Sequence, residues 1–160
     1  MIRTATPEDA PAICAIYNPY ITNDVTSFEQ HAVSITDMEA RMTIVLEHYP
    51  WLVYEDGGEV LGFAYASRFK KRHAYRYVAE TTVYLPPQTT RKGIGTALYT
   101  ALLEQLKTQG ITQAVGCIAL PNPASVALHE KLGYTKVAHF PKVGYKFDQW
   151  IDVAYWQKAL

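Results

Sequence analysis

The 160-residue chain predicts an α/β fold, because strand-like and helix-like segments alternate along it. Two runs rich in branched and aromatic residues, at 51–54 and 60–69, are joined across Gly57-Gly58, a pair typical of a hairpin turn. Apolar residues recur at helical spacing over 94–106, which indicates a helix with one buried face. A strand-like run at 111–120 follows that helix, so the second half of the chain also alternates.

The remaining elements are predicted in chain order. Residues 2–5 read as a short strand, and Thr6-Pro7 favours a helix start because Thr caps helices and Pro suits their first position. A second helix is expected to begin near Ser34 or Thr36. The later expectations are a strand at 75–85, a helix at 124–132 closed by Gly133, and final strands at 134–140 and 153–156. This order predicts one domain over residues 1–160.

Composition narrows the function classes. Hydrophobic residues make up 49% and charged residues 19% of the chain, which is ordinary for a globular protein. The formal net charge is zero, so no net positive potential attracts nucleic acid or an anionic membrane. No apolar run approaches the roughly 20 residues of a membrane span, and residues 1–4 lack the apolar core of a signal peptide. Cys14 and Cys117 form no disulfide framework and have no metal-ligand spacing. We therefore expect a cytoplasmic protein without a metal, nucleic-acid or membrane partner.

The most informative segment joins the strand at 75–85 to the helix at 94–106. It passes through Pro86-Pro87 and then the basic, glycine-bearing loop Arg91-Lys92-Gly93-Ile94-Gly95-Thr96. Backbone N–H groups gathered at the positive end of a helix bind phosphate, and glycines let a ligand approach the backbone closely. The loop lacks the Gly-Lys-Ser/Thr of a nucleotide P-loop, and Leu98 stands where a dinucleotide loop needs a small residue. It predicts a phosphate or pyrophosphate site of another kind, with an ordinary helix start as the alternative.

That loop resembles the pyrophosphate loop of the GNAT N-acetyltransferases, Gln/Arg-x-x-Gly-x-Gly/Ala, with Thr90 at the first place. Residues 122–134, Asn-Pro-Ala-Ser-Val-Ala-Leu-His-Glu-Lys-Leu-Gly-Tyr, resemble the second GNAT motif. The run 80–85, Glu-Thr-Thr-Val-Tyr-Leu, is similar to a strand of the phosphinothricin and methionine sulfone/sulfoximine acetyltransferases. Further matches extend the resemblance over nearly the whole chain.

The resemblance implies a fold and a co-substrate. The GNAT fold has a mixed central sheet of about six to seven strands flanked by about four helices, with a splayed strand pair at the cofactor site. The co-substrate is acetyl-CoA, whose pantetheine arm pairs with the backbone of Val83, Tyr84 and Leu85 like an added strand. An N–H near Leu85 would also face the thioester oxygen. The resemblance assigns the pyrophosphate contacts to Arg91, Lys92, Gly93, Ile94, Gly95 and Thr96. It assigns further cofactor contacts to Asn122 and Ser125. Asn122-Pro123 is also good helix-capping chemistry, and both roles can hold.

Amine acetylation needs a base, because an ammonium group has no lone pair with which to attack. The resemblance places Glu80 at the position of the proposed base, and strand alternation puts it on one face with Tyr84. A structural ion pair of Glu80 with Arg76 or Arg72 is the alternative. His129 stands where many GNAT enzymes carry a Tyr that donates a proton near the cofactor thiol, and a purely structural histidine is the other interpretation. Tyr84 is an alternative proton donor.

The expected acceptor is a small amine that carries an acidic group, such as phosphinothricin, methionine sulfone or methionine sulfoximine. The candidate pocket walls are Phe28, Glu29, Arg72, Tyr75 and Arg76, since Arg binds a carboxylate or phosphinate in a bidentate fork. A solvated basic loop is the alternative for the arginines. The resemblance implies a homodimer, and the residues that could line either the pocket or the dimer seam are Tyr75, Lys146, Phe147 and Trp150. Alternative functions are transfer to a protein N-terminus or another amine, and a catalytically silent CoA-binding module.

Overall fold

The computed structural model describes residues 1–89 and 93–160, which contain a seven-stranded sheet in the order β1-β2-β3-β4-β5-β7-β6. The strands are β1 (Ile2–Thr4), β2 (Trp51–Asp56), β3 (Glu59–Arg68), β4 (Val78–Tyr84), β5 (Gln113–Leu120), β6 (Thr135–Lys146) and β7 (Gln149–Ala159). The helices are α1 (Ala10–Thr22), α2 (Ile35–Leu46), α3 (Ile94–Thr108) and α4 (Pro123–Lys131), with 3-10 turns η1 (Pro7–Asp9) and η2 (His73–Tyr75). The predicted α/β fold with a mixed sheet and flanking helices is confirmed.

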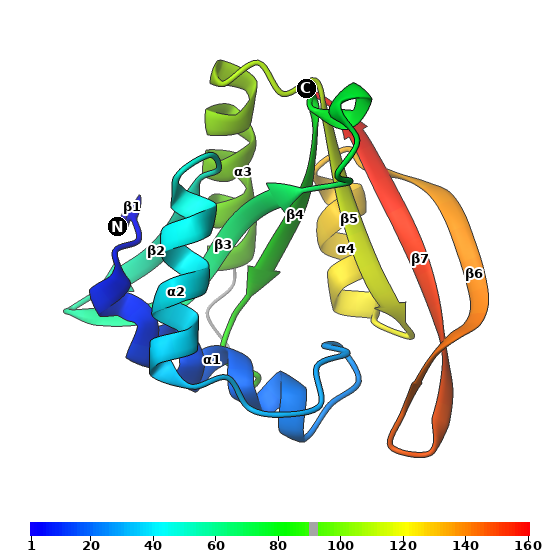
Figure 1. Cartoon of the computed structure of the whole chain (residues 1–160), viewed down its shortest axis with the longest axis horizontal. Helices are drawn as coiled ribbons and strands as arrows, with labels where there is room; N and C mark the ends of the chain where they lie inside the picture. Colours follow the sequence, from blue (N-terminus) through cyan, green and yellow to red (C-terminus); the bar gives the residue numbers. More distant parts are fainter. Residues whose placement is uncertain (90–92) are drawn as a thin grey trace.

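The sheet opens between β4 and β5. These two strands are parallel, whereas the other neighbouring strands within residues 1–89 and 93–160 are antiparallel. Their register runs only from Val78 opposite Gln113 to Glu80 opposite Val115. Beyond that point β4 stays paired with β3 up to Tyr84, while β5 stays paired with β7 up to Leu120. Figure 1 shows the two strands diverging below this junction. The expected splayed pair is therefore present, and each strand turns an unpaired edge toward the gap.

Apolar side chains pack helices against both faces of the sheet and form a front and a rear layer. Figure 1 shows α1 and α2 in front of the sheet and α3 and α4 behind it. The front layer packs Ile13, Met38 and Met42 on Trp51, Val53 and Phe63. The rear layer packs Leu98, Leu102 and Leu106 on Ala64, Ala79 and Ile118. Because side chains alternate along a strand, β4 presents Ala79, Thr81 and Val83 to the rear layer and Glu80, Thr82 and Tyr84 to the front layer.

The local start signals act as the sequence predicts. Ser34 caps α2, since its hydroxyl accepts a hydrogen bond of 3.1 Å from the backbone N–H of Asp37. Thr6 precedes η1, which leads into α1. None of the helices within the described residues is both long and apolar enough to span a membrane.

Three predicted strands have bounds that are wrong by three residues or more. The strand expected from residue 75 begins at Val78, because the chain first makes the 3-10 turn η2. The final strands expected at 134–140 and 153–156 are longer and form a hairpin that turns at Phe147-Asp148. Both turn residues have positive φ, 51° and 56°, a conformation that glycine usually supplies, so the turn carries no glycine signal in the sequence.

Candidate active site

The gap between β4 and β5 is a cleft of about 350 Å³. Its lining residues come from α1, both splayed strands, α3 and α4, and the first and last of them, Tyr20 and His129, are 109 positions apart in the chain. The predicted site residues that line it are Val83, Tyr84, Leu85, Gly95, Asn122, Ser125 and His129. The structure thus brings together the strand, the glycine loop and the second motif in one cavity.

The first turn of α3 closes one end of this cleft. Gly93 precedes the helix with φ of 97°, a left-handed conformation that side chains other than glycine rarely adopt. The N–H groups of Ile94, Gly95 and Thr96 belong to the first turn, where a helix offers no carbonyl partner. A Cβ at Gly95 would lie 3.4 Å from Leu128 Cδ2, so the helix packs closely on the cleft wall. The predicted contacts of Arg91 and Lys92, like Thr90 of the motif, lie outside the described residues.

Asn122 begins α4 on the opposite wall. Its side-chain oxygen accepts a hydrogen bond of 3.2 Å from the N–H of Ser125, which confirms the capping alternative. The two residues also line the cleft. The cap uses the side-chain oxygen, while the amide N–H₂ is a separate donor group. A cofactor contact through this amide remains a prediction.

His129 is buried, at 3% exposure, and belongs to a hydrogen-bonded cluster in the cleft wall. Its Nδ1 lies 2.7 Å from the Ser125 carbonyl oxygen, which requires Nδ1–H to donate, and its Nε2 lies 3.1 Å from the Tyr99 hydroxyl. The same hydroxyl is 3.1 Å from the Thr81 carbonyl oxygen. Burial lowers the pKa of His129, so the imidazole is neutral at pH 7. The ring therefore faces the cleft as a neutral, oriented group.

Tyr99 is a cleft residue that the sequence did not single out. It is fully enclosed, and it links His129 to the backbone of β4. Its one sequence signal is its place four residues after Gly95, on the same face of α3. Gly116 of β5 makes room for the cluster, since a Cβ there would lie 2.3 Å from His129 Nε2.

Glu80 lies at the apex of the splay, as the last β4 residue in register with β5. Burial raises the pKa of its carboxyl group. The pKa of Cys117 is also raised, mainly by burial and to a lesser extent by the negative charge of Glu80. Within residues 1–89 and 93–160 it forms no ion pair with Arg72 or Arg76, so the structural alternative for Glu80 is not supported. A half-buried carboxyl group with no cationic partner fits a proton acceptor.

Tyr84 points to the front layer, where its ring lies 4.9 Å from that of Tyr17, 5.0 Å from that of Tyr20 and 5.6 Å from that of Phe63. Burial raises the pKa of its phenol well above the usual value, so the group stays protonated. Tyr20 donates a 2.7 Å hydrogen bond to the Leu85 carbonyl oxygen, which fixes the end of β4. The Leu85 carbonyl is thus engaged inside the protein.

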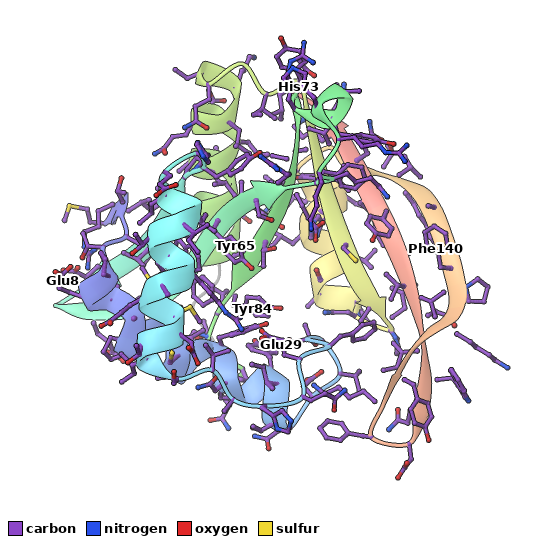
Figure 2. All side chains as sticks on the ribbon, viewed as in Figure 1. Glu8, Glu29, Tyr65, His73, Tyr84 and Phe140 are labelled. Carbon is purple, nitrogen blue, oxygen red and sulfur yellow. The ribbon has the colours of Figure 1, made fainter. Side chains whose placement is uncertain are left out.

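The candidate acceptor residues fall into two groups at opposite ends of β4. Glu29 pairs with Arg41 through contacts of 2.6 and 3.0 Å and also accepts from the Tyr17 hydroxyl. The Phe28 ring packs over Gly144, where a Cβ would lie 2.4 Å from it. Figure 2 places Glu29 close to Tyr84, at the C-terminal end of β4.

The basic segment lies at the N-terminal end of β4, where Figure 2 places His73 far from Glu29. Arg72 precedes η2, Tyr75 packs edge-to-face on Phe69, and Arg76 lies 4.4 Å over the Tyr77 ring. The seven residues of β4 span roughly 20 Å between the two groups. One small acceptor therefore does not touch all five predicted wall residues within this chain.

Lys146 has a different role from the one expected. Its side chain is buried at 3% exposure, which excludes a dimer seam, and Lys146 is not among the residues that line the cofactor cleft. The ammonium donates to the backbone carbonyls of Ile21, Asp24 and Ser27 at 2.7, 2.7 and 2.6 Å. It ties the loop after α1, which carries Phe28 and Glu29, to the β6–β7 hairpin.

Comparison with known proteins identifies the family. A family model described as an acetyltransferase (GNAT) domain matches residues 2–155. The chain belongs to this GNAT family. It is 41% identical over 157 residues to the phosphinothricin N-acetyltransferase of Streptomyces viridochromogenes, covering 98% of this chain and 86% of that protein.

Two further relatives agree. The L-methionine sulfoximine/L-methionine sulfone acetyltransferase of Pseudomonas aeruginosa is 35% identical over 161 residues, covering 99% of this chain and 94% of that protein. The crystal structure of a GNAT phosphinothricin acetyltransferase from Sinorhizobium meliloti in complex with acetyl-CoA matches with a TM-score of 0.95 and 34% identity, covering 100% and 88% of the two chains. The protein is an acetyl-CoA-dependent N-acetyltransferase of the phosphinothricin and methionine sulfoximine branch, and the predicted family and enzyme class are confirmed.

Proposed function

We propose that this GNAT enzyme acetylates the primary amine of a small amino-acid-like acceptor of the phosphinothricin, methionine sulfone or methionine sulfoximine type. The observation that carries the proposal is Glu80, a half-buried carboxyl group with a raised pKa at the point where β4 and β5 separate. The names of relatives at 35–41% identity support the acceptor class.

The cleft fits acetyl-CoA, which supplies the acetyl group when bound. The unpaired edges of β4 and β5 beyond Glu80 suit a chain of amides that adds to a sheet edge, with Val83 and Leu85 as the pairing residues. The N–H groups of Ile94, Gly95 and Thr96 suit a pyrophosphate at the start of α3. Asn122 and Ser125 lie on the opposite wall.

Proton transfer is the step that the chain's own side chains perform. Glu80 accepts a proton from the acceptor ammonium, directly or through water, which frees the lone pair for attack. Its raised pKa brings it closer to the working pH, where a general base is most effective. His129 and Tyr84 are the candidate proton donors. Burial raises the pKa of the Tyr84 phenol, so this group keeps its proton. The single ring proton of neutral His129 is on Nδ1 and is donated to the Ser125 carbonyl oxygen, so Tyr84 is the donor that the proposal favours.

Recognition of the acceptor's acid group is assigned to the exposed arginines near the N-terminal end of β4. Arg72 and Arg76 lie closest in sequence to Glu80, four to eight residues before it. Their planar forks suit a carboxylate. We also propose a homodimer, which the exposed aromatic rings of Phe147 and Trp150 on the β6–β7 hairpin support.

The test is acetyl-CoA turnover, followed as release of free thiol, against a panel of amines. The panel holds phosphinothricin, methionine sulfone, methionine sulfoximine, ordinary amino acids, an aminoglycoside, a polyamine and a peptide with a free N-terminus. Turnover confined to the amino-acid-like compounds supports the proposal. Turnover with the peptide alone, or acetyl-CoA binding without turnover of any amine, contradicts it.

A further inference from the structure

A buried hydrogen-bonded cluster lies on the rear side of the sheet, at the level where β4 and β5 separate. Its four members come from four parts of the chain: Thr81 of β4, Tyr99 of α3, His129 of α4, and Tyr134, which precedes β6. Each of them is at most 3% exposed. The Thr81 and Tyr134 hydroxyl oxygens are 2.9 Å apart, and the Tyr99 hydroxyl joins Thr81 to His129. Such a cluster is directional, because each hydrogen bond restricts a distance and an angle.

The cluster contacts both residues of the first step at which the strands no longer pair. The register of β4 with β5 ends at Glu80, so Thr81 and Gly116 would form the next pair. The backbone carbonyl of Thr81 accepts a hydrogen bond of 3.1 Å from the Tyr99 hydroxyl. On the other strand, the His129 ring occupies the space beside Gly116, where a Cβ would lie 2.3 Å from Nε2. Tyr99 and His129 therefore contact one strand each, at the level where the splay begins.

The bridge between the two strands is a short series of fixed contacts. The Tyr99 hydroxyl lies 3.1 Å from the Thr81 carbonyl oxygen and 3.1 Å from His129 Nε2. The imidazole is oriented in turn, because its Nδ1–H donates to the Ser125 carbonyl oxygen at 2.7 Å. The Tyr99 and His129 rings meet edge to face, with centroids 5.2 Å apart. The hydroxyl and the ring thus limit how closely the two strands can approach each other at this level.

The two strands would otherwise gain by pairing. Beyond Glu80 each of them turns an unpaired backbone edge toward the gap, and unpaired edges gain free energy when they form a ladder. β4 and β5 are already parallel neighbours over 78–80 and 113–115, so the ladder would only need to extend. The apolar contacts of the rear layer are non-directional and oppose such a shift less than hydrogen bonds do. A cleft that stays open without a ligand therefore needs a contact that keeps these edges apart.

We propose that Tyr99 and His129 form a spacer that holds β4 and β5 apart and so sets the width of the cleft. The inference rests on the proposal that this cleft binds acetyl-CoA. Both residues line the cleft, and they reach it from α3 and α4, which lie behind the sheet (Figure 1). The spacer keeps the cleft open for the cofactor's chain of amides, which would otherwise have to separate paired strands before it binds. Tyr99 is a positioning residue, because it acts through the backbone of β4 and not on the reacting atoms.

The first test is Tyr99→Phe, which keeps the ring and removes the hydroxyl that reaches the Thr81 carbonyl. KM for acetyl-CoA should rise about fivefold, the effect of about one net hydrogen bond that the cofactor must displace, while kcat at saturating acetyl-CoA is unchanged. Tyr134→Phe is the matched control, because it removes a buried hydroxyl of the same cluster that contacts the Thr81 side chain and not its backbone. A rise of the same size in both variants, or no rise in Tyr99→Phe, would overturn the inference.

The second test is hydrogen exchange of the ligand-free enzyme, followed by mass spectrometry over residues 81–85 and 116–120. Loss of the spacer should slow exchange in both segments of Tyr99→Phe, because newly paired amides are protected. A variant that is only destabilised would exchange faster, so the sign of the change separates strand closure from general loosening. Faster or unchanged exchange in Tyr99→Phe contradicts the spacer.

The same measurement with acetyl-CoA distinguishes this inference from the proposed function. In the wild type, acetyl-CoA should slow exchange in both segments. Protection of both strands by acetyl-CoA, together with unchanged exchange in ligand-free Tyr99→Phe, would overturn the spacer alone and leave the cofactor site intact. Acetyl-CoA that protects neither strand would overturn both.

Discussion

Gly116 offers a sharp test of how the His129 cluster is packed. In Gly116→Ala the new Cβ would lie 2.3 Å from His129 Nε2 and 2.6 Å from its Cδ2. The ring is confined by Tyr99 and Tyr134, at centroid distances of 5.2 and 5.0 Å, so it can move only by giving up its bonds to Tyr99 and the Ser125 carbonyl. Two lost hydrogen bonds at about 1 kcal/mol each, with about 1–2 kcal/mol of overpacking, predict a destabilisation of about 3–4 kcal/mol.

The assay is thermal and urea unfolding, with acetyl-CoA affinity measured in parallel. For a chain of this size the loss corresponds to a fall in Tm of roughly 10 °C. In a His129→Ala background the same Gly116→Ala change should cost less than about 1 kcal/mol, because the clashing ring is gone. An unchanged Tm in the single variant, or an equal cost in both backgrounds, would refute the reasoning.

Three more predictions concern the base, the buried lysine and the glycine loop. Burial raises the pKa of Glu80, so kcat/KM of the wild type should fall as pH drops through that raised value. Glu80→Gln should remove this fall and lower kcat/KM by about 10²–10³ at neutral pH, where Glu80 is ionised, and by less at high pH, where the amine is already neutral. Full activity across a pH series would exclude the residue from the mechanism. Lys146→Met removes three hydrogen bonds to backbone carbonyls and should cost about 3–5 kcal/mol in urea unfolding, whereas the exposed Lys131→Met should cost less than about 0.5 kcal/mol; equal costs would contradict the buried role. Gly93→Val places a β-branched residue at φ of 97° and should weaken acetyl-CoA binding at least tenfold by calorimetry, and an unchanged Kd would count against the loop assignment.

Features that depend on neighbouring residues are encoded in the amino-acid sequence itself. The cap at Ser34, the left-handed glycine at 93 and the helix start at Asn122 each depend on the bonds and torsions of a few consecutive residues. The alternation of strand and helix depends on burial of one face, which leaves a periodic pattern in the sequence. The GNAT motifs combine these local features, and so the fold and enzyme class followed from the chain itself.

Contacts between distant segments were decided only by the tertiary structure. The sequence offered no sign that Lys146 would reach carbonyls about 120 residues earlier, or that Tyr99 would meet His129. The same holds for a cavity of about 280 Å³ on the front face of the sheet, whose walls come from α1, α2 and three strands. The fold and the family could be predicted from the sequence, and the cofactor loop and the candidate base could be proposed from it, because each depends on a short stretch of chain. The tertiary structure was needed to identify the side chains around the candidate base, because they come from segments that are distant in the sequence and that only folding brings into contact.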